Sequence, residues 1–323
     1  MDAFDKHFSR RSEPLSFSLL RNYALAFVFL AAVSAVAGFE VGHLRAIWAN
    51  LKLAPLAPLA GSTSRLTSDP VNAEFAELTR LAPQQQAEQL LERAIHRQQG
   101  TLELIRDHVE GWRGRVQNTD RLFDLVLTAM KSEDLRVRSA AVEIDLVANN
   151  LPKTPKSVAR LVREIRKDPV ERPFALWRLG ALGNRGVQPK MVLAHLVAFS
   201  RDANEQTRFW AVEGLAMLGS DAAIDPLLDR FAHDASPRVR QRAACGLAES
   251  GMLTREQRLA AVPDLLNLLD DDSLESDTRG WVYGALRLIT GEPLGNNAHA
   301  WQEWWAHHDS IKKPASSKGI VFA

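Results

Sequence analysis

From Val71 onward, apolar side chains recur every three to four residues, which is the period of an amphipathic α-helix. The stretches Asn72–Ala82, Pro83–Arg97 and Thr101–Gly114 each fit one helix. Beyond Thr119 a longer unit recurs: an amphipathic helix, a turn rich in acidic residues or proline, and a second helix rich in alanine. No stretch alternates as a strand would. The pattern therefore predicts an all-α fold built from antiparallel helix pairs.

The second helices align on an arginine, with spacings of 34, 36, 32 and 39 residues. The five aligned residues are Arg138, Arg172, Arg208, Arg240 and Arg279. An alanine or valine follows three residues after each arginine, and a leucine follows seven residues after all but the first, where Asp145 stands. A period of this length is typical of a solenoid of stacked repeats. We expect the alanine and leucine positions to face the core.

The pattern divides the chain into seven segments. We predict a basic N-terminal leader (1–22), a transmembrane signal-anchor helix (23–42), a Pro/Ala/Ser linker (43–70), degenerate helical repeats (71–118), five repeats (119–291), a tryptophan-rich capping helix (292–309) and a disordered tail (310–323).

The anchor prediction rests on Tyr23–Phe39, which carries no charge. A helix of this length reaches about 26 Å, close to the lower limit for crossing a bilayer. More Lys and Arg precede it than follow it, so the N-terminus should stay in the cytoplasm and the repeats should lie outside it, in the periplasm. Two alternatives remain: a signal peptide cleaved near Ala37, which would give a secreted protein, and a buried core helix.

The repeat unit from Asp120 to Gly291 resembles HEAT repeats, with an acidic turn, a Val/Thr-Arg start and an Ala-rich second helix. The ending TGEPLGNNAHAWQEWW is similar to the last helix of many bacterial HEAT-repeat proteins, including uncharacterised membrane-anchored ones. The resemblance implies an armadillo-like α-solenoid that works as a scaffold or binds proteins, and it implies no reaction. It also implies an arginine ladder, in which the five arginines hydrogen-bond turn aspartates of neighbouring units (Asp134, Asp168, Asp202 and Asp234).

Three tryptophans lie close to the end of the chain, at Trp301, Trp304 and Trp305. Their spacing puts them on one face of one helical turn. Because the last repeat of a solenoid leaves an apolar end uncovered, we predict that these rings cap it. An aromatic ligand box is the alternative.

The composition limits the kinds of ligand and reactive group that the chain can have. The net charge is +1, and five basic and four acidic residues lie within residues 1–45, so the remainder is neutral. Nucleic-acid binding, which calls for a basic excess, is therefore disfavoured. The single cysteine, Cys245, excludes an intramolecular disulfide, and Arg242 one turn earlier weakly suggests a reactive thiol. His307-His308 and Asp270–Ser276 fit neither a zinc nor a calcium site.

No catalytic, cofactor or metal motif is found, and the resemblance to HEAT repeats implies a non-enzymatic scaffold for a protein or peptide partner. A lyase-type or accessory HEAT-repeat enzyme component is the alternative.

A helical wheel locates a candidate partner surface. Counting from each arginine, positions two, five and nine point away from the core. These positions carry the candidate partner-binding residues Phe174, Trp177, Trp210, Met217, Trp281 and Leu288. That is more apolar surface than a solvated face should carry, and an apolar strip of this kind favours a partner site. The alternative is that the rings lean sideways into the neighbouring repeat.

Overall fold

The computed structural model describes residues 77–78 and 80–308. The described residues all belong to one compact unit. The predicted leader, membrane anchor and linker, together with the tail, lie outside the described residues. Within the described part, none of the helices combines the length and the apolar character that crossing a bilayer requires.

The described residues form helices and no strands, which confirms the all-α prediction. The first helices after the undescribed segment are α4 (Pro83–Ile95), α5 (Thr101–His108) and the 3₁₀ helix η1 (Val109–Trp112). The pairs that follow are α6 (Asp120–Ala129) with α7 (Leu135–Ala148), α8 (Pro155–Lys167) with α9 (Arg172–Asn184), α10 (Pro189–Phe199) with α11 (Glu205–Leu218), and α12 (Ile224–His233) with α13 (Pro237–Ala248). The chain continues through α14 (Arg255–Ala260), α15 (Val262–Leu269), α16 (Ser276–Thr290) and α17 (Ala298–His308).

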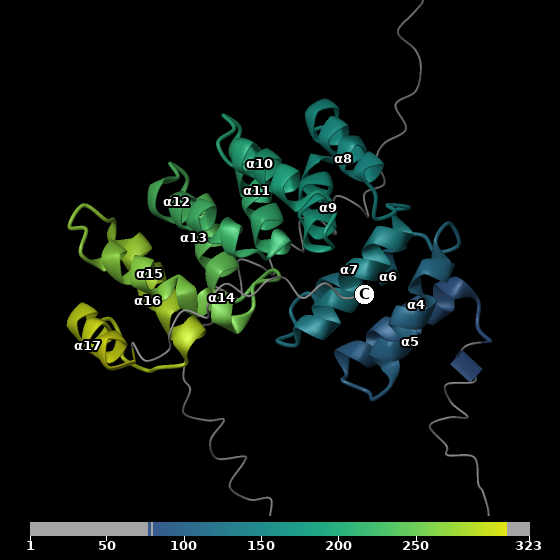
Figure 1. Ribbon diagram of the computed structural model, residues 1–323, viewed down its shortest axis with the longest axis horizontal. Coiled ribbons are helices and arrows are strands. Elements are labelled where there is room, and N and C mark those ends of the chain that lie inside the picture. The colour runs from purple at the N-terminus through teal and green to yellow at the C-terminus, as the bar shows by residue number, and fades with distance from the viewer. Residues whose placement is uncertain (1–76, 79, 309–323) are drawn as a thin grey trace, which may run out of the picture. The chain divides into compact units, whose positions relative to one another are not determined.

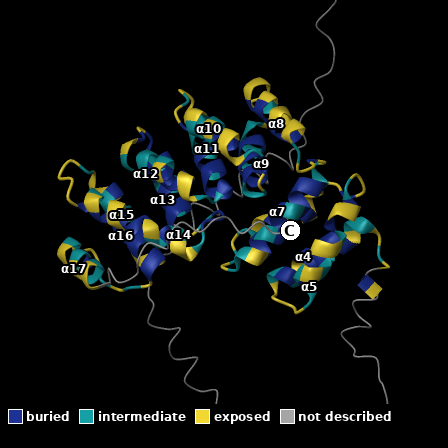
Figure 2. Ribbon diagram, in the orientation of Figure 1, coloured by how far each residue is buried: buried dark blue, intermediate teal, exposed yellow. Residues whose placement is uncertain are grey.

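The helices from α8 to α16 form two layers (Figure 1). The second helices α9, α11, α13 and α16 pack on one another in chain order. The first helices α8, α10, α12 and α15 each pack against the second helix of their own pair. Buried residues lie where the two layers meet, and exposed residues cover the outer sides of the first helices (Figure 2).

Two hydrophobic cores fill the described unit. The first extends from Leu78 to Val147 and the second from Val142 to Trp301. Helix α7 contributes to both, because Ile144 faces the first core and Leu146 faces the second. This helix is therefore the junction between the N-terminal helices and the longer array of pairs.

Glycine allows α9 and α11 to approach closely. A Cβ atom on Gly180 would lie 2.1 Å from the carbonyl oxygen of Gly214, and one on Gly214 would lie 2.7 Å from the carbonyl oxygen of Leu176. Real Cβ atoms do not tolerate such distances, so any larger residue would force the helix backbones apart. These two glycines fix the spacing of the second and third pairs.

The fifth unit differs from the prediction. The repeat pattern predicts a single first helix in each unit, whereas here the chain forms α14 and α15 with a break at Ala261. The loop between α13 and α14 lies against the end of α11, where the Met252 amide donates to the Ala216 carbonyl at 2.9 Å. This insertion accounts for the 39-residue spacing between Arg240 and Arg279, the longest of the four.

Arg258 holds that insertion in place. Its buried guanidinium donates to the Leu247 carbonyl at 2.9 Å and the Ser250 carbonyl at 2.8 Å, so it satisfies acceptors at the C-terminal end of α13. Burial, with a smaller contribution from the nearby positive charge of Arg138, lowers the pKa of Arg258 to about 10. The side chain therefore remains charged at neutral pH.

Candidate partner-binding surface

Four aromatic rings from three helices form one continuous row, which we call the aromatic row: Phe123 (α6), Phe174 (α9), Trp210 and Phe209 (α11). The ring of Phe174 lies 5.8 Å from that of Phe123, at 78°, and 6.2 Å from that of Trp210. Trp210 and Phe209 meet edge to face at 5.6 Å. Such pairs add about 0.5–1.5 kcal/mol each beyond the apolar area they bury. The row therefore links three successive helix pairs.

Cations flank the row. The Arg238 guanidinium of α13 lies 4.3 Å from the centre of the Phe209 ring, and that of Arg178 lies 5.5 Å from the centre of the Phe174 ring. All four rings of the row are half-buried, so each keeps part of its surface available to a partner. Half-buried rings bordered by arginines have the composition of protein–protein interface cores.

A shallow cavity of about 150 Å³ opens beside Trp210, between the turns that precede α9 and α11. Pro169, Pro173, Asn204 and Gln206 contribute to its lining. Its walls thus combine apolar rings with side-chain amides, which can bind the polar backbone of an extended peptide. The indole Nε1 of Trp210 is buried and has no hydrogen-bond partner among the described residues.

The structure separates the six residues of the predicted strip. Phe174 and Trp210 lie in the aromatic row, and Trp177 is half-buried beside the second core, whereas Leu179 and Leu215 of the same helices are fully buried. Trp281 is also half-buried, and Leu288 is 57% exposed. Among the described residues, neither Trp177 nor Trp281 stacks on another aromatic ring.

Met217 corrects the prediction, because it is only 1% exposed and cannot contact a partner. Val147 and Ala181 at the equivalent position are buried as well. Position nine of the wheel therefore belongs to the packed side of α7, α9 and α11, whereas Glu249 and Leu288 at the same position are exposed. The loop after α13 also lies against the last turn of α11, where Met217 stands.

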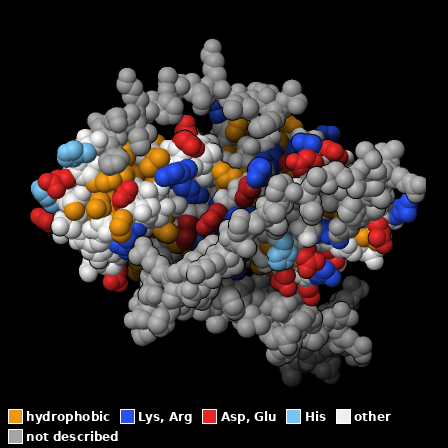
Figure 3. All heavy atoms as spheres, turned by 90° about the horizontal axis from the view of Figure 1, so that it is seen from below, with side chains coloured by type: hydrophobic (Ala, Val, Ile, Leu, Met, Phe, Trp, Pro, Cys, Tyr) orange, Lys and Arg blue, Asp and Glu red, His pale blue; other side chains and the backbone are white. Residues whose placement is uncertain are grey.

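An ion pair interrupts the strip in the fourth pair. Arg242 occupies the position that Trp210 and Trp281 hold in their helices, and its guanidinium donates to the Glu213 carboxylate at 2.7 Å. Both side chains are largely buried. Trp281 and Leu288 are therefore separated from the aromatic row by a polar contact. On the face seen in Figure 3, hydrophobic patches of the described residues are divided by charged side chains.

Sequence reasoning missed Phe123 and Phe209. Phe209 stands next to Trp210, but the wheel directs it towards the neighbouring helix. Phe123 belongs to a first helix, whereas the wheel positions refer to second helices only. Its contact with Phe174 depends on how α6 packs beside α9. The periodicity of the sequence does not predict that packing.

The five aligned arginines are tied to the chain around them. Each donates to a backbone carbonyl in the turn before its helix or at the end of the preceding helix: Ser132, Ile165, Asp202, Asp234 and Leu269, in chain order. Three also reach the next unit, Arg172 to Thr207 at 3.2 Å, Arg208 to Asp234 at 2.9 Å and Arg240 to Thr278 at 3.1 Å. Arg138 instead donates to the Gly251 carbonyl at 2.7 Å, and Arg279 stays within its own unit.

The turn aspartates have a smaller role than the resemblance implied. Of these four aspartates, only Asp234 accepts a hydrogen bond from one of the five arginines through its carboxylate. Asp134 pairs with Arg136, while Asp168 and Asp202 accept from backbone amides of their own turns. Three of the four predicted aspartates therefore stabilise local turns.

The tryptophans of α17 differ in burial. Trp301 is fully buried in the second core, and its indole nitrogen donates to the Gly295 carbonyl at 2.9 Å. Trp304 and Trp305 are half-buried and pack against the same core. The three rings contact one another in succession, at 6.0 and 6.1 Å. Helix α17 contacts α15 and lies at the end of the described array.

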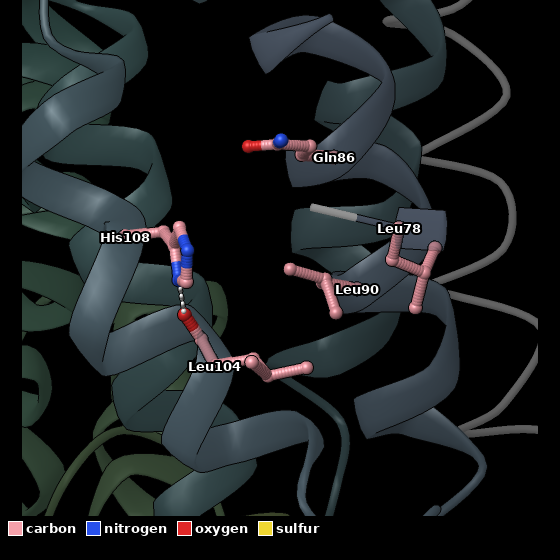
Figure 4. Close-up of a pocket in the computed structure, with 5 residues that line it drawn as sticks. All are labelled: Leu78, Gln86, Leu90, Leu104 and His108. Carbon is pink, nitrogen blue, oxygen red and sulfur yellow. Dashed lines mark hydrogen bonds between the residues drawn. The ribbon is translucent and has the colours of Figure 1, made fainter. Parts of the chain in front are cut away.

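Three further features bear on possible chemistry: the Cys245 thiol, the metal-ligating side chains and a hollow between α4 and α5. Burial raises the pKa of the Cys245 thiol more than Arg242 lowers it, which favours a small packed side chain over a reactive thiolate. The described residues contain no group of three or more metal-ligating side chains. A hollow between α4 and α5 is too narrow to admit a water molecule, and His108 in it lies within hydrogen-bond distance of the Leu104 carbonyl (Figure 4).

Residues 158–248 match the family model of HEAT repeats. The match extends from α8 to α13 and includes Phe174, Phe209 and Trp210 of the aromatic row. No curated protein matches the chain. The match and the stacked helix pairs together support a HEAT-repeat protein with a helical solenoid, a class that commonly serves as a scaffold for protein interactions.

Proposed function

We propose that this chain is a non-enzymatic scaffold, anchored in a membrane by residues 23–42, that binds an extended segment of another protein along the aromatic row. The observation that supports this proposal is the continuity of four half-buried rings across α6, α9 and α11. The cavity beside Trp210 provides a place for one inserted side chain. The neutral net charge of residues 46–323 favours a contact dominated by apolar burial and not by long-range attraction.

Truncating the Trp210 side chain should weaken the binding of the partner. We expect a peptide selected on the full-length chain from a displayed library to lose about 30-fold in affinity on Trp210→Ala, because aromatic anchors are worth about 2 kcal/mol or more. The measurement is a fluorescence titration of the labelled peptide. Trp281→Ala is the matched control, since it removes a half-buried tryptophan outside the row. Equal losses in both variants, or no loss in either, would place the site elsewhere.

The anchor has a separate test. We expect the full-length chain to remain in the membrane fraction after alkaline carbonate extraction, and Val28→Arg/Val33→Arg to release it, because each arginine at a membrane centre costs about 2.5–3.5 kcal/mol. Leu56→Arg/Leu59→Arg in the linker is the control and should change nothing. A mature N-terminus at Gly38 would instead establish the cleaved signal peptide.

A further inference from the structure

The outer side of α8 carries a stripe of four cations, which we call the basic stripe: Lys156, Arg160, Arg163 and Lys167. At 100° per residue they fall within an arc of about 60°, and at 1.5 Å per residue they extend over about 16 Å. All four are exposed. The opposite side of the helix, with Val158, Leu161 and Ile165, is buried in the second core.

The stripe is poor in counter-charges. Arg160 pairs with Glu164 at 2.7 Å, while Lys156, Arg163 and Lys167 have no ion-pair partner within the part of the chain that the structure describes. Because the chain beyond residue 45 is neutral, this is a local concentration of positive charge. Cationic side chains that lie on one helix face without ion-pair partners are available to an anionic partner.

Exposed apolar side chains accompany the stripe. Val170, three residues after Lys167, is 67% exposed, and Met191 of α10 is 49% exposed. Met191 lies one helical turn before His195, whose pKa is lowered by burial and by the nearby Arg166 of α8. Because i and i+4 share a helix face, Met191 and His195 lie on the same side of α10.

We propose that the basic stripe, together with Val170 and Met191, docks the helical unit onto the surface of a bilayer that contains anionic phospholipid. Unpaired Lys and Arg attract the headgroups, and the two apolar side chains can enter the interface between headgroups and acyl chains. Helix α8 lies on the surface without inserting, since its apolar side is packed in the core. This contact is distinct from the aromatic row and does not depend on residues 23–42.

A fluorophore at position 191 tests the docking. The full-length chain with Cys245→Ser and Met191→Cys, labelled with an environment-sensitive dye, is reconstituted into phosphatidylcholine vesicles with or without phosphatidylglycerol. We expect a blue shift of the emission in the anionic vesicles only, reversed by high salt. Arg163→Glu/Lys167→Glu should lower the ratio of docked to undocked protein by about tenfold or more.

Arg255→Glu/Arg287→Glu is the matched control, because both residues are exposed and the net charge changes equally. It should leave the blue shift intact. The proposal is overturned if the emission is the same in both kinds of vesicle, or if the control abolishes the shift as completely as the stripe variant. A shift produced by added polyglutamate, but not by anionic lipid, would also overturn it and assign the stripe to an acidic protein segment.

Discussion

Replacing Asp145 with leucine should lower the free energy of unfolding by about 3–5 kcal/mol, although the other four units carry leucine at this position. Asp145 is only 4% exposed, and its carboxylate accepts from the Arg178 guanidinium of the next pair at 3.0 and 3.3 Å. The substitution leaves a buried guanidinium without its counter-charge, and that cost exceeds what the added apolar surface contributes. Chemical denaturation followed by far-ultraviolet circular dichroism measures the change.

The double variant Asp145→Leu/Arg178→Met is the control. When both partners of a buried ion pair become apolar, the desolvation cost of both charges disappears, so stability should return to within about 1 kcal/mol of the original. Arg178→Met alone should also destabilise the fold, because the buried carboxylate then lacks its partner. If both single substitutions proved harmless, the pair would contribute nothing to the junction between α7 and α9.

Trp301→Ala should lower the free energy of unfolding by about 3–5 kcal/mol, the usual cost of removing a fully buried ring. The indole of Trp301 is completely buried, and its nitrogen holds the Gly295 turn. Trp305→Ala, in the same helix but half-buried, should cost clearly less. Hydrogen exchange of α15 and α16 reports the loss most directly, since these helices end the array.

The control for this experiment is Gln302→Ala, which removes an exposed hydrogen bond to Asp270 from the same helix. Its effect should stay below about 1 kcal/mol, as is usual for a surface substitution. Equal stability of the Trp301 and Gln302 variants would mean that the array does not require a cap.

The regular part of the fold could be predicted from the sequence. Helix pairs follow from an apolar period and from turn residues such as Asn204 and Ser236, whose side chains cap the helices that follow them. Both patterns involve residues that are close together in the sequence, so they can be recognised without knowledge of the tertiary structure. The burial of Leu179 and Leu215 follows from the same period.

The candidate site could be predicted only in part, because it depends on contacts between helices. Phe174 and Trp210 share one wheel position, but Phe123 joins them from a first helix, through packing that no periodicity specifies. Asp145 at a leucine position indicated a departure from the repeat. Only the structure shows that Asp145 forms an ion pair with Arg178. The prediction that Met217 is exposed was wrong, because a straight helical wheel does not show which side of a stacked helix packs against its neighbours.

The hydrogen bond from Arg138 to the Gly251 carbonyl has a consequence for folding cooperativity. In a simple repeat array each unit contacts only its neighbours, so the ends can unfold while the middle persists. This bond joins residues that are 113 positions apart, the first pair and the loop after the fourth. Loss of either end therefore exposes a buried polar group at the other. The array from α7 to α14 should consequently behave more like a closed globular domain than like a chain of independent units.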